Sequence, residues 1–177
     1  MRRLFLLLLI LIAAYAGYPY LTLYWLDEAL LTDDKQALER LVDFPLVRAD
    51  LKADVKSDVY AKTREAAEKR PILGTFGEAL AKLLAPSLVD STVDTLVRPD
   101  AILDNPTVVE HRERHESFID FVDYAFFSSP TTFKLDLKDP GKPSTPTLTA
   151  IVEFSGFRWR IVGVDLPPVE TLFFESK

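Results

Sequence analysis

The stretch from Tyr20 to Phe44, YLTLYWLDEALLTDDKQALERLVDF, decides the fold, because it predicts two helices folded back on each other at a polar turn. In the first half, leucines recur three and four residues apart and form one apolar face. They are Leu23, Leu26, Leu30 and Leu31. Asp27 and Glu28 are expected to face water. Thr32 or Asp33 is expected to cap a second helix, whose apolar face contains Leu38, Leu41 and Val42.

Asp43 and Pro45 predict the start of a third helix. A carboxylate at this position accepts bonds from free backbone N–H groups, and proline in the first turn loses no hydrogen bond. The long helix that follows carries aspartates four residues apart, which are interpreted as its solvated face because they lack the pattern of a calcium loop. Two more helices are expected, from Ile72 to Leu84 and from Pro86 to Val97.

After Pro106 the apolar period changes from about four residues to two, which indicates strands. Strands are expected near 118–127, 133–138, 148–154 and 157–163, with Ser155-Gly156 as the link of a hairpin. The predicted fold class is therefore α+β. An N-terminal signal or anchor helix precedes several helices that pack on a curved antiparallel sheet of about four strands.

The N-terminus predicts export. Arg2 and Arg3 precede the apolar run Leu4–Ile12, and Ala14-Tyr15-Ala16 fits the cleavage pattern of a signal peptide. An uncleaved membrane anchor is the alternative, since no charged residue occurs between Arg3 and Asp27. In either case the two arginines favour the cytoplasmic side for the N-terminus, so the predicted location is periplasmic or anchored in the inner membrane facing the periplasm. The expected division is a signal or anchor at 1–18, one α+β domain at 19–168 and a tail at 169–177.

The amino-acid composition excludes several kinds of functional site. The 177 residues include no cysteine, which excludes disulfides, thiol nucleophiles and cysteine-ligated zinc. The net charge of −6 argues against binding to nucleic-acid backbones. The two histidines, His111 and His115, have helical spacing but no third metal ligand. No catalytic residue, metal or cofactor is predicted.

A polar corner is the candidate ligand site. Asp43 and Arg48 lie at the start of the third helix, Arg98 follows a later helix, and Tyr24 and Trp159 supply aromatic walls. The simpler alternative makes Asp43 a helix cap, the arginines solvated, and the aromatic residues part of the core.

The sequence resembles a known family. DEALLTDDKQALERLVDFPLVRADLK, preceded by YPYLTLY and followed near the C-terminus by FRWRIVGVDLP, resembles the bacterial domain-of-unknown-function family 2939 over Tyr18 to Pro167. The resemblance implies an exported or membrane-anchored envelope protein and carries over no catalytic residue. More distantly, the order of helices and strands is similar to the cone-shaped nuclear transport factor 2-like fold, which hosts many functions.

Two function classes follow. The first is a non-catalytic envelope module that contacts the membrane through an uncleaved N-terminal segment and binds an envelope protein partner. The second is a binder of, or enzyme on, a small apolar molecule held in the cone. A hollow of about 300 Å³ or more with converging polar groups would favour the second class. The sequence does not indicate an oligomeric state.

Overall fold

The computed structural model describes residues 2–69, 86–138 and 147–165, with the backbone alone for 58–69 and 86–88. The helices are α1 (Arg2–Leu31), α2 (Lys35–Leu41), α3 (Phe44–Lys69), α5 (Pro86–Leu96), α6 (Pro99–Leu103), α7 (Pro106–Arg114) and the 3-10 helix η2 (Phe118–Phe121). The strands are β1 (Val122–Ser129), β2 (Thr132–Leu137), β3 (Leu148–Ser155) and β4 (Arg158–Asp165). The helix expected at 72–84 and the expected tail at 169–177 lie outside the described residues.

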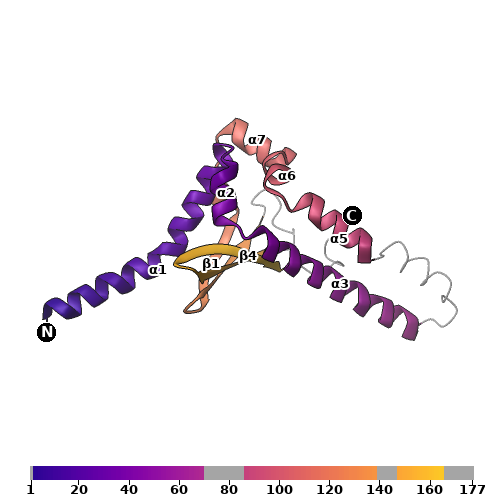
Figure 1. Ribbon diagram of the computed structural model, residues 1–177, viewed down its shortest axis with the longest axis horizontal. Coiled ribbons are helices and arrows are strands. Elements are labelled where there is room, and N and C mark those ends of the chain that lie inside the picture. Colours follow the sequence, from indigo (N-terminus) through magenta and orange to yellow (C-terminus); the bar gives the residue numbers. More distant parts are fainter. Residues whose placement is uncertain (1, 70–85, 139–146, 166–177) are drawn as a thin grey trace.

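The α+β prediction is confirmed. The four strands form one open antiparallel sheet in the order β1-β2-β3-β4, so each strand pairs with its neighbours in the sequence. The helices precede the sheet in the chain, and Figure 1 shows α1 extending to one side of the sheet while α3 and α5 extend to the other. Alternation is clear on β2, where Phe133 and Leu135 are buried and Lys134 is half-buried.

One helix replaces two expected segments at the N-terminus. The apolar run and the helix expected to begin near Tyr20 form the single helix α1, 30 residues long. Pro19 lies inside this helix, and Figure 1 shows α1 bending part-way along its length. A proline lacks the N–H that would bond the carbonyl four residues earlier, which accounts for a bend without ending the helix.

The polar turn differs from the prediction in its cap. Asp34, rather than Thr32 or Asp33, caps α2 by accepting a hydrogen bond from the Ala37 N–H at 2.9 Å. Asp33 instead has a left-handed backbone, with φ of 59°. Nearby, Lys35 Nζ lies 2.7 Å from Asp100 Oδ1 on α6, and this hydrogen bond raises the pKa of the lysine.

The expectation that Asp27 faces water is wrong. Asp27 is only 9% exposed. Its carboxylate accepts hydrogen bonds from the Phe118 N–H at 2.6 Å and from the Ser117 hydroxyl at 3.0 Å. Those bonds explain how a carboxylate is buried here, because they replace its lost water contacts. Through these hydrogen bonds, Asp27 links α1 to the start of η2, which directly precedes β1.

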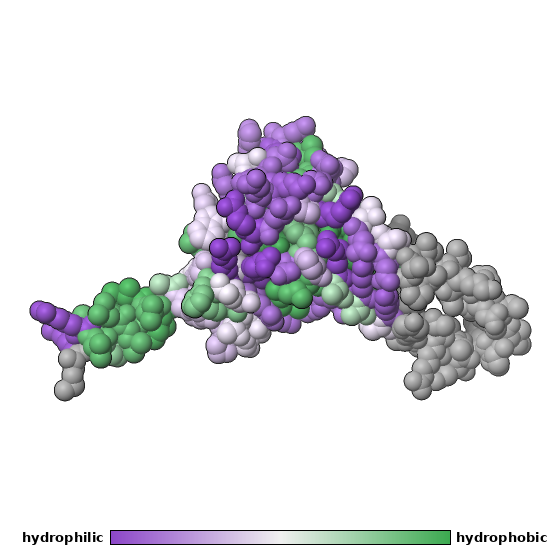
Figure 2. All heavy atoms as spheres, viewed as in Figure 1, coloured by the Kyte–Doolittle hydropathy of each residue, from purple (hydrophilic) through white to green (hydrophobic). Residues whose placement is uncertain are grey.

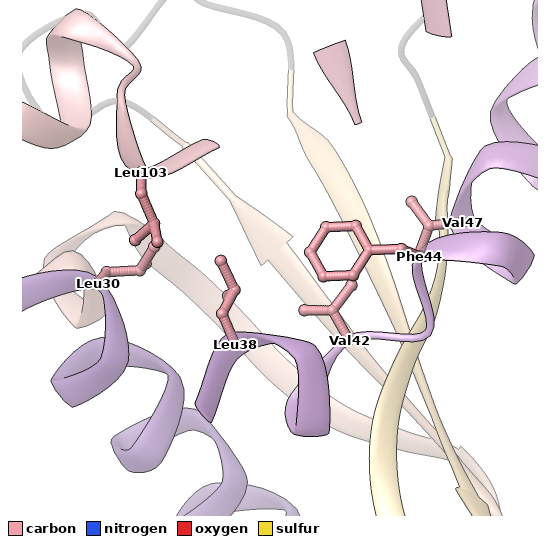
Figure 3. Close-up of a cluster of buried hydrophobic side chains, with 6 residues drawn as sticks. All are labelled: Leu30, Leu38, Val42, Phe44, Val47 and Leu103. Carbon is pink, nitrogen blue, oxygen red and sulfur yellow. The ribbon is translucent and has the colours of Figure 1, made fainter. Parts of the chain in front are cut away.

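Two apolar clusters form the core. The helix cluster contains Leu30, Leu38, Val42, Phe44, Val47 and Leu103, which converge from α1, α2, α3 and α6 in Figure 3. The sheet cluster contains Phe133, Leu135, Ala150, Val152 and Trp159. Ile161 on β4 packs against both clusters. A continuous apolar interior therefore joins the helices to the sheet.

The hairpin between β3 and β4 turns one residue later than expected. Its link is Gly156-Phe157, flanked by the pair Ser155 and Arg158, and both link residues have positive φ, 58° and 64°. Two-residue hairpin turns of this kind match the twist of the strands. Phe157 was expected to continue the return strand, but it lies in the turn and is 88% exposed.

The segment after Pro106 was expected to switch to strands, but it first forms α7. Asn105 caps this helix by accepting a hydrogen bond from the Thr107 N–H at 3.0 Å, and Pro106 occupies its first turn. His115 ends the helix in a left-handed conformation, with φ of 54°. The local cap and proline therefore outweigh the weak apolar period of this segment.

β4 is held against α3 through Asp50. The Asp50 carboxylate accepts a hydrogen bond from the Val164 N–H at 2.8 Å, and an added Cβ at Gly163 would overlap its Oδ2 atom.

We expect Gly163→Ala to lower the free energy of unfolding by about 1–3 kcal/mol, because Asp50 must move and release a backbone N–H. Urea denaturation of parent, Gly163→Ala, Asp50→Ala and the double variant checks this. Full additivity of the two substitutions would contradict the proposed displacement of Asp50.

Candidate functional site

A groove lies between α1, α2 and β4, with a volume of about 360 Å³. We call it the Arg40–Arg158 groove. It is lined by Tyr18, Thr22, Trp25, Ala37, Arg40, Leu41, Arg158 and Trp159. The α1 residues recur four and three positions apart and the α2 residues three and one apart, so each helix contributes one face. The groove is thus formed by α1, α2 and strand β4 of the last hairpin.

Three of the residues that line this groove are aromatic. Tyr18 and Trp25 meet edge to face, with ring centroids 6.2 Å apart. Trp159 is only 2% exposed and packs against Tyr15, Phe127 and Phe154 in the sheet cluster. Within the described chain, its buried indole N–H has no hydrogen-bond partner. A buried donor without a partner is uncommon in folded proteins.

Two arginines, Arg40 and Arg158, also line the groove. A second hollow of about 370 Å³ shares Arg40 and Arg158 with the groove and adds Glu39, Ser155, Gly156 and Arg160. The only hydrogen bond found for the Arg40 side chain among the described residues runs from its Nε to the Gln36 carbonyl, at 3.1 Å. Neither Arg40 nor Arg158 is paired with a carboxylate in the ranges that the structure covers. The two guanidinium groups therefore retain donors for an anion.

The predicted polar corner is only partly assembled. Asp43 accepts a hydrogen bond from the Leu46 N–H at 3.3 Å, as expected of a helix cap, and its other oxygen lies 2.8 Å from Arg160 Nη1. Arg48 points elsewhere, because its Nη1 donates to the Val97 carbonyl at 3.0 Å. Asp43 thus has a structural role at the junction of α3 and β4.

The remaining predicted site residues are dispersed. Arg98 is exposed before α6 and its Nε donates to the Thr95 carbonyl at 3.1 Å. Tyr24 is exposed on α1 and is not among the groove residues, whereas Trp159 is. Of the five predicted residues, the groove therefore includes Trp159 alone. Their role in ligand binding stays a prediction.

The groups that are able to hold a metal are separate from the groove. His111 packs against Phe118 and Phe121, while His115 ends α7, so the two imidazoles do not share a helix face. Ligand oxygens of Asp50, Asp54 and Asp165 lie within 4.8 Å of one another. Asp50 already accepts the Val164 N–H, and Asp165 lies 3.4 Å from Lys134 Nζ. These contacts give two of the three carboxylates a structural role.

Residues 8–104 match the family described as "Protein of unknown function (DUF2939)". The chain belongs to the DUF2939 family. The match covers more than half of the chain, starts inside the apolar part of α1 and ends just after α6. The DUF2939 region thus supplies the α1 and α2 walls of the groove, and β4 lies beyond the match. Comparison with curated proteins and with solved structures gives no match, so the likeness to the nuclear transport factor 2-like cone stays a prediction.

Sequence reasoning missed Arg40 and Arg158 as a pair. Arg40 follows Ala37 by three residues on α2, and Arg158 directly precedes the buried Trp159 on β4. Each looks like an ordinary solvated arginine in its own element. A local signal was present only in the alternation of Arg158, Trp159 and Arg160, which places the two arginines on the face opposite the tryptophan.

Proposed function

We propose that this protein is a membrane-anchored envelope module that keeps its N-terminal helix and acts by binding rather than catalysis. The observation that carries the proposal is the continuity of α1. The helix is long and apolar enough to cross a membrane. Figure 2 shows that the surface of its N-terminal part is apolar, with hydrophilic residues at the end. The same helix then packs into the folded domain.

Tyr15 supports retention of the helix. Its hydroxyl donates to the Pro130 carbonyl at 2.7 Å, and its ring meets Phe154 and Trp159 with centroids 5.4 and 5.8 Å away. Cleavage after Ala16 would remove this side chain from the sheet cluster and cut α1 within its length. An uncleaved anchor preserves both the aromatic contacts and the helix.

The helix is long enough for a span if part of it runs beside the domain. At a rise of about 1.5 Å per residue, Tyr15, which contacts the sheet, lies about 18 Å along the helix from Arg3, so the rest of a hydrocarbon core of about 30 Å would lie beside the domain. Leu4–Ile12 are exposed, as expected for side chains that face lipid. Arg2 and Arg3 at the far end favour the cytoplasmic side, which supports a location of the domain outside the cytoplasm.

The alternative, a binder of a small apolar molecule inside the cone, loses support at the sheet. Tyr15, Tyr18 and Leu23 of α1 pack directly on the sheet cluster, where such a molecule would otherwise lie. The groove beside α1 nevertheless exceeds about 300 Å³ and includes arginines, which meets the criterion for a ligand site. Binding therefore belongs at this groove rather than within a cone.

We expect the mature protein to retain residues 1–16 and to resist extraction by alkaline carbonate. Intact-mass measurement of protein from membranes tests retention, and a C-terminal reporter active only outside the cytoplasm tests orientation. Replacing Arg2 and Arg3 with glutamate is the control, since it should lower reporter activity by weakening the orientation signal. A mature chain that begins at Gly17, or an inactive reporter on a stable fusion, would overturn the proposal.

A further inference from the structure

We propose that the Arg40–Arg158 groove binds the phosphate headgroup of an anionic phospholipid from the leaflet next to the domain. In this arrangement the phosphate lies between the two guanidinium groups and the glycerol region lies against Tyr18 and Trp25. The inference rests on the proposed function, because the anchored helix is what brings the groove to a membrane surface.

The charge of the groove selects an anion. Arg40 and Arg158 both line it, and neither has a carboxylate partner in the described chain. Arginine presents a planar set of donors that matches the oxygens of a phosphate. The adjoining hollow adds Arg160 and Glu39, so the groove and the hollow together hold three arginines and one carboxylate in a chain whose net charge is −6.

A second observation comes from buried donors. The indole N–H of Trp159, a groove residue, and the Nε–H of Arg160, which lines the adjoining hollow, are both buried without a partner among the described residues. Donors of this kind carry a free-energy cost unless something accepts their hydrogen bonds. Arg160 lines the adjoining hollow and is otherwise paired with Asp43, so Trp159 supplies the unpartnered buried donor among the groove residues.

Position selects a lipid over a free anion. Tyr18 and Trp25 follow the exposed apolar run Leu4–Ile12 on the same helix, so the groove lies next to the part of α1 that would enter a membrane. Tyrosine and tryptophan are enriched where membrane proteins leave the hydrocarbon. Phe157, 88% exposed, adjoins Arg158 at the hairpin tip and supplies an apolar side chain for the same interface. Anionic headgroups attract basic side chains held near the surface.

The test uses the full chain in a non-ionic detergent and three probes: dihexanoyl phosphatidylglycerol, dihexanoyl phosphatidylcholine and inorganic phosphate. Intrinsic fluorescence reports directly, because the chain has two tryptophans and both line the groove. We expect saturable binding of the phosphatidylglycerol and binding at least about tenfold weaker for the other two probes.

The Arg40→Ala/Arg158→Ala double variant should bind phosphatidylglycerol about tenfold or more weakly. Arg98→Ala/Arg114→Ala is the matched control, because it removes the same charge from exposed arginines outside the groove and should bind as the parent does. Circular dichroism melts establish that both variants fold. Should the groove variant fail to fold, the comparison of the three probes on the parent chain still tests whether the protein prefers an anionic phospholipid.

Equal binding of phosphatidylcholine, or unchanged binding by the groove variant, would overturn the inference. Equal binding of inorganic phosphate would assign the groove to a free anion and overturn its lipid assignment. These results are independent of anchoring, since the chain is already in detergent. A cleaved or inverted N-terminus would instead overturn the proposed function and leave the groove titration interpretable.

Discussion

Phe133→Ala is expected to lower the free energy of unfolding by about 3–5 kcal/mol, the usual range for truncating a buried aromatic residue. Phe133 is completely buried in β2, at 0% exposure, and its ring meets those of Tyr20 and Phe127 with centroids 5.0 Å away in each case. Alanine would remove both contacts and leave a void between α1 and the sheet. Urea denaturation in detergent, followed by tryptophan fluorescence, measures the effect.

Phe157→Ala is the matched control for this substitution. It makes the same chemical change, but Phe157 lies in the exposed turn between β3 and β4, so we expect the free energy of unfolding to change by no more than about 0.5 kcal/mol. The difference between the two variants isolates burial from the intrinsic effect of the substitution. Similar losses for both would contradict the assignment of Phe133 to the core.

The sheet was predictable because its strands alternate strongly. Phe133 and Leu135, and then Ala150 and Val152, alternate with polar or less buried residues, and each pair is buried as expected. The hairpin turn was misplaced by one residue because Gly156 favours positive φ wherever it sits in a two-residue link. Sequence alone did not distinguish Ser155-Gly156 from Gly156-Phe157.

The helices were less predictable where tertiary contacts decide. Asp27 looks solvated on a helical wheel, yet Phe118 and Ser117 from a distant segment donate to its carboxylate. A helix was expected to begin near Tyr20, but the packing of Tyr15 and Tyr20 on the sheet accompanies a bent, continuous helix α1. Local propensity is a weak guide when such contacts compete with it.

The groove was beyond prediction for a related reason. Its arginines lie on α2 and β4, and only the β3–β4 hairpin folding back toward the helix pair brings them to one hollow. The predicted corner of Asp43, Arg48 and Arg98 relied on adjacency at helix ends. In the structure, Arg48 and Arg98 donate to the backbone near α5 instead.

Leu38→Ala is expected to lower the free energy of unfolding by about 2–5 kcal/mol. Leu38 is 1% exposed at the centre of the helix cluster, between Leu30 and Leu103 on one side and Val42 and Phe44 on the other (Figure 3). Truncation would therefore open a void where α1, α2, α3 and α6 meet. Leu46→Ala on α3 is the control, because Leu46 is 50% exposed and should cost far less.

Leu38→Ala also tests whether the helix and sheet clusters belong to one domain. Ile161 packs against both clusters, and the Asp43 N–H donates to its carbonyl at 2.8 Å, so loss of either cluster should release the other. We expect Leu38→Ala to shift the transitions seen by tryptophan fluorescence and by far-ultraviolet circular dichroism together, as in two-state unfolding. A fluorescence transition left in place while the helical signal shifts would show that the sheet unfolds independently, and the single-domain prediction would then be wrong.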